Sequence, residues 1–334
     1  MILTIDDARR LVTDAMIATG HTADEAGVIA DHLMDCELRG LGFGGLARAV
    51  SIIERERGAA GERRTITTVK ETPVSATIDG GDRVGYLVAQ RATDLAIAKV
   101  RTSGITVVGA YETWYTGMLA YYLEQVTAAG FAGMAAGSGG HIVAPHGGTQ
   151  GRFATNPIAF GFPSAAGPVI WDIGTSSITL AEVLLAHRVG RPLPDGAAFD
   201  GDGQPTTDPM AALGGALTVW GGHKGSGLAL VVQLLGMMCG AAADPDGLRD
   251  CGFFLLVVDP ALLTPVDDYP QRVADYAELL RSTRPVDLDR PVRVPFDRSV
   301  AERAARRAEG TINVADEVHH ILVELTSSAG HSPA

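Results

Sequence analysis

The sequence predicts a protein of the α/β class. In the middle of the chain, segments with helical hydrophobic spacing alternate with short apolar segments typical of buried strands. The chain has 334 residues, of which 46% are hydrophobic and 20% charged, and it carries no internal repeat. A chain of this size can bury a full core without a disulfide or metal to stabilise it. We therefore expect one large domain or two interleaved ones.

The N-terminal part is predicted to be helical. Apolar residues recur at helical spacing from Asp6 to Leu38, with a break at Gly20-His21. Capping signals at Thr4 and Thr22 predict two helices, one on each side of this break. A third helix is expected over Gly45–Arg57.

The rest of the chain alternates between strands and helices. Strands are expected within 66–78 and over 105–109, 131–136, 158–162, 169–172 and 252–259. Helices are expected over 84–100, 118–129, 177–188 and 225–240, and surface helices over 274–282 and 299–309. The apolar stretch Leu228–Met238 is too short to span a bilayer, which predicts a buried helix.

The charge and the cysteines restrict the class of protein. A formal net charge of −12 disfavours nucleic acids and anionic membranes as partners, because both require a cationic surface. The cysteines Cys36, Cys239 and Cys251 have no metal-ligand or CxxC spacing, and their odd number fits reduced thiols in the cytoplasm. The first twenty residues lack the basic and apolar regions of a signal peptide. We expect a cytoplasmic protein.

Two glycine-rich segments could bind phosphate. Gly137-Ser-Gly-Gly lacks the last glycine of the Rossmann pattern, because Ile142 stands there, so it is either a turn or a simple phosphate cradle. Gly221–Gly227 precedes an apolar helix and contains Lys224, a combination suited to an anion at a helix N-terminus. The alternative is a surface loop with one solvated lysine.

Other segments carry weaker signals. Thr155 and Asn156 precede a proline and could bind a ligand or bond their own turn. Asp172 lies at the end of a strand, where α/β layers place ligand groups, although a lone aspartate is more often a helix cap, here for the helix from Ser177 onward. The histidines show no metal-ligand spacing, and no nucleophile motif indicates a hydrolase.

The order of these segments resembles the type 2 malate/L-lactate dehydrogenase family, which includes ureidoglycolate and sulfolactate dehydrogenases and cyclic ketimine reductases. The resemblance runs nearly end to end. Its motifs are Leu38-Arg-Gly40 followed by Arg48, Gly147-Gly148, Ala154-Thr-Asn-Pro157, Trp171-Asp-Ile-Gly-Thr-Ser176, Asp202-Gly-Gln-Pro-Thr-Thr-Asp-Pro209 and Gly221-Gly-His-Lys-Gly225.

The resemblance implies a homodimer with a non-Rossmann α/β fold that binds NADH or NADPH. Residues 1–75 with 290–334 would form a helical, substrate-side region, and 76–289 the cofactor-binding and dimerisation region. Arg48 would hold a substrate carboxylate, for which a guanidinium is well shaped. The cofactor residues implied are His141, Gly147, Thr155, Asn156, Asp172, Thr175, His223 and Lys224.

The chain departs from the family at both expected catalytic histidines. Gly44 stands where the first is usual, and Tyr115 stands where the second is usual. Reduction of a ketone requires a proton for the developing alkoxide, a contribution of roughly 10²- to 10⁴-fold in rate. A cyclic iminium can already carry that proton, so positioning and hydride transfer suffice.

We therefore expect an NAD(P)H-dependent reductase of a small or medium substrate, with an imine or an unusual carbonyl or enone compound favoured over malate or lactate. One alternative is ordinary 2-oxoacid reduction with Tyr115 as the acid. Another is a catalytically silent relative that binds a nucleotide or a partner.

Overall fold

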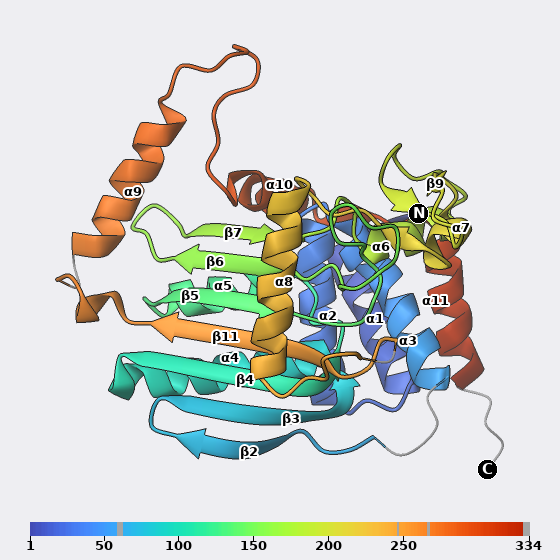
Figure 1. Cartoon of the computed structure of the whole chain (residues 1–334), viewed down its shortest axis with the longest axis horizontal. Coiled ribbons are helices and arrows are strands. Elements are labelled where there is room, and N and C mark those ends of the chain that lie inside the picture. The colour runs from blue at the N-terminus through green and yellow to red at the C-terminus, as the bar shows by residue number, and fades with distance from the viewer. Residues whose placement is uncertain (59–62, 246, 266–267, 330–334) are drawn as a thin grey trace.

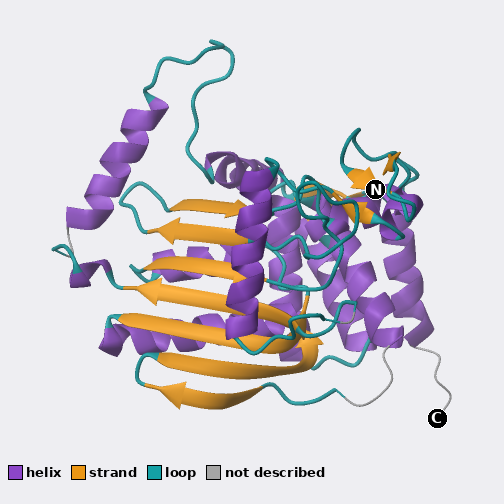
Figure 2. Cartoon of the chain, viewed as in Figure 1, coloured by secondary structure: helices purple, strands orange, loops and turns teal. Residues whose placement is uncertain are grey.

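The computed structural model describes residues 1–58, 63–245, 247–265 and 268–329. A mixed β-sheet with helices on both faces meets a helical layer at one end of its strands (Figures 1 and 2). Of the described helices, none is long and apolar enough to cross a membrane. The α/β class predicted from the alternating patterns is confirmed.

The helical layer is built from both ends of the chain. It contains α1 (Ile5–Ala18), α2 (Ala23–Leu38), α3 (Leu46–Gly58) and α11 (Asp316–Ala329), with α10 (Asp297–Glu309) against α2. Thr4 and Thr22 cap α1 and α2 as predicted, Thr22 within a complete capping box. The short strands β1 (Ile2–Thr4) and β12 (Thr311–Asn313) pair antiparallel and fasten the chain ends together.

The large sheet has seven strands in the order β2-β3-β4-β11-β5-β6-β7. Only β3 and β4 pair in parallel, joined through α4 (Gly85–Ser103), while every other pair in this sheet is antiparallel. A Rossmann sheet is mostly parallel, so this topology agrees with the failed Rossmann motif at Gly137. The strands are β2 (Thr67–Thr72), β3 (Ser75–Val84), β4 (Ile105–Trp114), β5 (Ala132–Gly137), β6 (Ile158–Phe162), β7 (Val169–Ile173) and β11 (Cys251–Val258).

Strand β4 is longer than the predicted 105–109. It continues to Trp114 although Glu112 and Gly109 interrupt the apolar run. The reason is pairing on both sides, since Thr113 faces Arg83 of β3 and Cys251 of β11. This extension carries the following residue, Tyr115, to the edge of the helical layer.

Helices α4 and α5 (Leu119–Ala128) cover one face of the sheet, and α8 (His223–Met238) crosses the other (Figure 1). The prediction of a buried helix over Leu228–Met238 is wrong for the single chain. Val232 and Gln233 pack inward, but a second apolar row faces outward and is between 48% and 66% exposed, namely Leu230, Val231, Leu234 and Met238. The helix is apolar on both sides, whereas the sheet covers only one of them.

The remaining elements lie around this core. A three-stranded sheet contains β8 (Ala198–Phe199), β9 (Pro205–Thr206) and β10 (Ala216–Leu217), near α6 (Leu180–Arg188) and α7 (Pro209–Leu213). Short 3₁₀ turns cover Gly42–Gly44 (η1) and Pro260–Leu262 (η2). Helix α9 (Asp268–Arg281) extends away from the body of the molecule (Figure 1).

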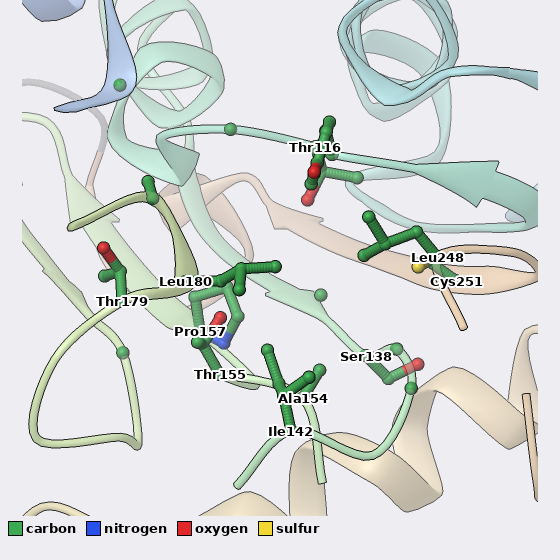
Figure 3. A pocket seen from close by; sticks show the side chains of 18 of the residues that line it. Thr116, Ser138, Ile142, Ala154, Thr155, Pro157, Thr179, Leu180, Leu248 and Cys251 are labelled. Atoms are coloured by element: carbon green, nitrogen blue, oxygen red, sulfur yellow. The ribbon is translucent and has the colours of Figure 1, made fainter. Parts of the chain in front are cut away.

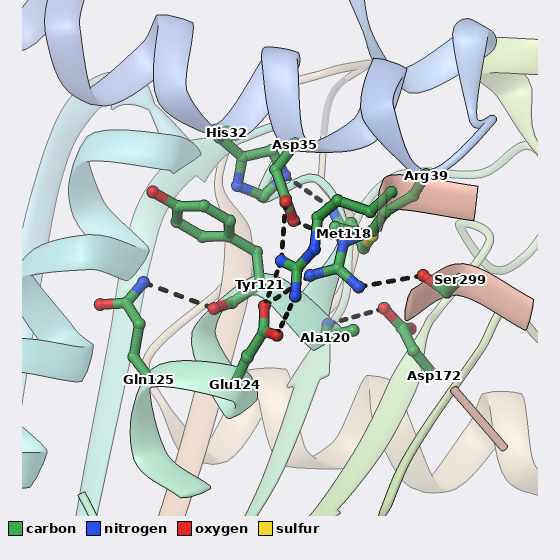
Figure 4. Close-up of polar contacts among 11 residues, drawn as sticks. His32, Asp35, Arg39, Met118, Ala120, Tyr121, Glu124, Gln125, Asp172 and Ser299 are labelled. Atoms are coloured by element: carbon green, nitrogen blue, oxygen red, sulfur yellow. Dashed lines mark hydrogen bonds and ion pairs between the residues drawn. The ribbon is translucent and has the colours of Figure 1, made fainter. Parts of the chain in front are cut away.

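A buried ion network joins the helical layer to the sheet layer. Arg39, which is fully buried, binds Asp35 at 2.6 Å and also contacts Glu124 of α5 (Figure 4). Arg303 of α10 reaches the same two carboxylates. The network therefore holds α2, α5 and α10 in one arrangement beside the cavity between the layers.

Candidate active site

A cavity of about 780 Å³ lies where the helical layer meets the ends of β4 and β5. This volume is typical of small-molecule sites. Its walls come from η1 and α3, the segment after β4, the glycine-rich loop after β5, the start of α6 and the loop before β11 (Figure 3). Of the predicted site residues, five line it: Arg48, Tyr115, His141, Thr155 and Asp172.

Arg48 of α3 points into this cavity. Its guanidinium carbon lies 4.1 Å from the centre of the Tyr115 ring, so the planar cation rests on the aromatic face. The residue is only 8% exposed, and its Nη1 atom is buried with no hydrogen-bond partner in the described chain. A cation this buried with no carboxylate partner is costly, so the part of the guanidinium that reaches the cavity is a natural contact for an anionic ligand.

Tyr115 has a backbone conformation that side chains rarely adopt. Its φ angle is +46°, and the following Gly117 has a φ of +72°. The neighbouring Trp114 is anchored by its indole N–H, which donates to the Asp82 carbonyl at 2.9 Å, and by the Arg55 guanidinium stacked 4.0 Å from its ring. These contacts maintain the strained turn that directs Tyr115 into the cavity.

Three aromatic residues form a floor behind Tyr115. Tyr86 of α4, Tyr121 and Tyr122 surround His32, with the His32 and Tyr86 ring centres 4.4 Å apart. His32 Nε2 accepts a hydrogen bond from the Met118 amide at 3.0 Å, and burial lowers the pKa of His32 to about 3. This histidine is therefore neutral and structural. Tyr86, by contrast, lines the cavity.

Asp172, at the end of β7, caps a helix other than the one predicted. Its Oδ2 accepts from the Ala120 amide at 2.8 Å at the start of α5 (Figure 4), whereas Thr179 caps α6. The proposed cap for Ser177 onward is thus corrected, because the sheet brings β7 beside α5 instead. Burial raises the pKa of Asp172 to about 6 against the effect of the Ala120 and Leu119 amides.

The predicted residues Asn156 and Thr175 lie behind the cavity wall. Both are fully buried. The Asn156 amide donates to Ala229 and Gln233 of α8, and the Thr175 hydroxyl donates to the Thr155 carbonyl at 3.0 Å. Neither residue lines the cavity. Their contacts instead fix the position of Thr155, which does line it.

Gly147, His223 and Lys224 lie outside the cavity at the exposed start of α8. The His146 and His223 rings are 6.2 Å apart, and the His146 amide donates to the Ser226 hydroxyl at 3.2 Å. Gly221 and Gly222 both have positive φ angles, which bend the chain into the helix. The two glycine-rich loops predicted as phosphate cradles thus lie apart, the loop after β5 in the cavity wall and this one at the surface.

Sequence reasoning missed Tyr86 as a cavity residue. It falls within the helical pattern over 84–100, where a single tyrosine carries no signal. Only the packing of the α4 start against the segment after β4 brings it to the cavity. Among the described residues, no cluster of histidine, cysteine, aspartate or glutamate side chains suits a metal ion.

Comparison with known proteins identifies the family. The model of the malate/L-lactate dehydrogenase family matches residues 3–323. The chain belongs to this family. It is 30% identical to an L-sulfolactate dehydrogenase of Methanothermobacter thermautotrophicus over 93% of this chain and 92% of that protein. A Δ1-pyrroline-2-carboxylate reductase of Ancylobacter novellus is 31% identical over 92% of this chain and 93% of that protein.

The fold agrees with this assignment. A solved dehydrogenase structure from Sinorhizobium meliloti superposes with a TM-score of 0.90 at 30% identity, covering 98% of each chain. The predicted family fold is therefore confirmed, and the protein is an NAD(P)-dependent oxidoreductase of the malate/L-lactate dehydrogenase family. The division into two regions and the roles of the individual site residues stay predictions.

Proposed function

We propose that this family member reduces a substrate with a single carboxylate and an apolar body, most readily at a C=N bond. The observation that supports this best is Arg48, a mostly buried cation that lines the cavity and whose guanidinium has no hydrogen-bond or carboxylate partner among the described residues. A substrate carboxylate would satisfy this donor and place the adjacent carbon in a fixed orientation. In this proposal Arg48 binds the carboxylate and the rest of the cavity receives the body of the substrate.

The charges of the cavity disfavour a second anionic group on the substrate. Arg48 is the one arginine or lysine among the described residues that line it, while Asp172 and Asp244 both bring carboxyl groups. Most other side chains there are apolar, including Leu41, Phe43, Met118 and Leu180. A dianion such as malate would leave one carboxylate without a partner cation, which is costly in a partly dehydrated site.

The missing histidines favour an imine over a ketone. Gly44 has no side chain, and a Cβ atom there would already touch the Cys36 thiol, 3.4 Å from Sγ. Burial raises the pKa of this thiol, so it cannot replace an imidazole as a proton donor at neutral pH. An iminium that already carries its proton requires no such donor. Ordinary 2-oxoacid reduction with Tyr115 as the acid, unusual carbonyl or enone reduction and a silent nucleotide-binding relative are the rival outcomes.

The cavity also fits a reduced nicotinamide, which supplies a hydride when bound. The wall Gly137–Gly140 has no side chain except Ser138, so backbone atoms form much of the surface that a flat ring would contact. A Cβ atom at Gly140 would lie 2.3 Å from the Gly247 carbonyl, which shows how tightly this wall packs. His141 and Thr155 would contact the cofactor there. Gly147, His223 and Lys224 would receive its phosphates at the start of α8.

Replacing Lys224 by alanine is expected to weaken NADH or NADPH binding by about tenfold, since a charge-assisted contact to phosphate is lost. Lys70→Ala on the edge strand β2 removes an equivalent charge far from the loops and serves as the matched control. Titration of intrinsic fluorescence with each cofactor measures the effect. Failure of the unmodified protein to bind either cofactor at millimolar concentration would remove the basis of the proposed reaction.

We also propose that the protein is a homodimer formed through α8. The outward row Leu230, Val231, Leu234 and Met238 forms an exposed apolar stripe on a helix that crosses the sheet. Exposed apolar stripes of this kind mark protein interfaces. Another copy of the chain would cover the stripe, as the resemblance to the family also implies.

Sedimentation at micromolar concentration is expected to give twice the mass of one chain, and Leu234→Glu is expected to give single chains. Val69→Glu places the same charge on edge strand β2, where Val69 is also exposed, and should leave the mass unchanged. A wild-type protein that sediments as single chains would exclude the dimer.

A further inference from the structure

Tyr86 occupies a position at the cavity that neither the family motifs nor the mechanism above uses. It follows Gly85 at the start of α4, which packs against the segment carrying Tyr115: a Cβ atom at Gly85 would lie 2.8 Å from the Thr116 amide. Tyr86 is only 2% exposed, yet it lines the cavity. Two tyrosines from separate elements thus reach the same space as Arg48.

The ring of Tyr86 is held in place from two sides. The His32 ring lies against it, and on the other side only a glycine fits, because a Cβ atom at Gly117 would lie 2.3 Å from Tyr86 Cε1. No hydrogen bond joins the Tyr86 hydroxyl to another described residue, and it is not among the fully enclosed polar atoms without a partner. The hydroxyl therefore opens onto the cavity with its hydrogen-bonding capacity unused.

Electrostatics keep this hydroxyl protonated. Burial raises the pKa of Tyr86 well above its ordinary value, and the positive charge of Arg48 opposes this effect without overcoming it. Tyr86 is therefore a neutral donor beside a cation. An anionic group is the strongest partner for Arg48, and an anion accepts a hydrogen bond from a phenol readily.

We infer that Tyr86 and Arg48 together hold the carboxylate of the substrate, the guanidinium through the edge that reaches the cavity and the phenol through its hydroxyl. The inference rests on the proposed function, since it concerns the same cavity and the same carboxylate. Tyr115 then has a different role from Tyr86. The Tyr115 ring packs against one face of the Arg48 guanidinium and so orients the edge of the guanidinium that binds the carboxylate. Two donors fixed on α3 and α4 would orient the carboxylate as well as bind it.

The test compares a cyclic α-imino acid with its methyl ester in the NADPH-bound enzyme. For the acid, Tyr86→Phe is expected to raise KM by about tenfold or more, with kcat changed by less than about threefold, because a hydrogen bond to a charged group is lost. The ester has no carboxylate, so its KM should be high in the wild-type enzyme and unaffected by Tyr86→Phe. Equal losses for acid and ester would overturn the inference, because a structural defect affects both.

Tyr122→Phe is the matched control. Tyr122 is also buried, but its hydroxyl donates to the Thr116 carbonyl at 2.9 Å and it does not line the cavity. Loss of the Tyr122 hydroxyl should lower the melting temperature, and any change in KM should be the same for the acid and for the ester.

A binding measurement makes the test independent of turnover. Cyclohexanecarboxylate, an unreactive carboxylate, is titrated by calorimetry into the NADPH-bound enzyme, and Tyr86→Phe is expected to weaken its affinity by about tenfold. Undiminished affinity in the variant, or no binding to the wild type, would overturn the inference. Failure of the proposed reaction would appear separately, as absence of turnover with the carboxylate still bound.

Discussion

Replacing Arg48 by methionine is expected to lower kcat/KM for a carboxylate substrate by about 10²- to 10³-fold. The reason is that a buried hydrogen-bonded charge pair is broken and the substrate carboxylate is left in the cavity without its partner. Steady-state turnover at saturating cofactor measures this effect. The kcat/KM of Arg48→Lys should lie between those of the wild type and Arg48→Met, because lysine keeps the positive charge but lacks the planar pair of donors.

Two controls separate this loss from damage to the fold. Arg57→Met removes a charge from the exposed end of the same helix, and its kcat/KM should stay within about twofold of the wild-type value. The affinity of Arg48→Met for NADH or NADPH should also be unchanged, because we propose that the cofactor phosphates bind at the start of α8, away from Arg48. Wild-type kcat/KM in Arg48→Met would show that the carboxylate binds elsewhere.

Gly117→Ala is expected to lower the free energy of unfolding by about 3 kcal/mol or more. The added Cβ atom would lie 2.3 Å from Tyr86 Cε1 and 2.4 Å from His32 Nε2, both on packed rings. Overpacking of this kind costs about 1 to 3 kcal/mol, and the positive φ of +72° adds a cost of the same order. Urea unfolding of the two proteins under the same conditions gives the difference.

Gly130→Ala separates the two costs. Gly130 has a φ of +91°, but a Cβ atom there would meet nothing within 4 Å, so only the backbone strain remains. The difference between the two variants is then the packing cost at Tyr86 and His32. Equal destabilisation by both substitutions would mean that the Tyr86 and His32 rings can move to make room for the added Cβ atom at little cost.

Local patterns predicted the fold class and most helices and strands, because capping residues and hydrophobic spacing act over a few residues. Thr22 with Glu25, for example, forms the capping box that starts α2. The length of β4 and the exposed face of α8 could not be read in this way. Both depend on which strands and helices lie alongside them, and that information is distributed over distant parts of the chain.

The candidate site shows the same division. Arg48 and Tyr115 were predicted from motifs, and the structure brings them into contact. For Asp172 the sequence predicts a cofactor-region residue, which stays a prediction; its alternative, a cap on the helix from Ser177 onward, is wrong, because the sheet places the carboxylate at the start of α5. In Gly221–Gly227 the sequence suggests glycines that leave room for an anion, but at least one has another reason to be there. A Cβ atom at Gly225 would lie 1.8 Å from the Trp220 carbonyl, so packing within the protein requires this glycine.

We propose that loss of both family histidines has moved the reaction from oxoacids to substrates that carry their own proton. The direct measurement is a comparison of kcat/KM for the reduction of a cyclic α-imino acid and of oxaloacetate and pyruvate, the oxoacids of malate and lactate, with NADH and with NADPH, in the wild type and in Tyr115→Phe. We predict that kcat/KM for the imino acid exceeds that for either oxoacid by about 10²-fold or more, because a positioned acid catalyst contributes at least about this factor to ketone reduction. Tyr115→Phe should retain most of the activity with the imino acid. Efficient reduction of oxaloacetate or pyruvate, unaffected by Tyr115→Phe, would contradict the claim.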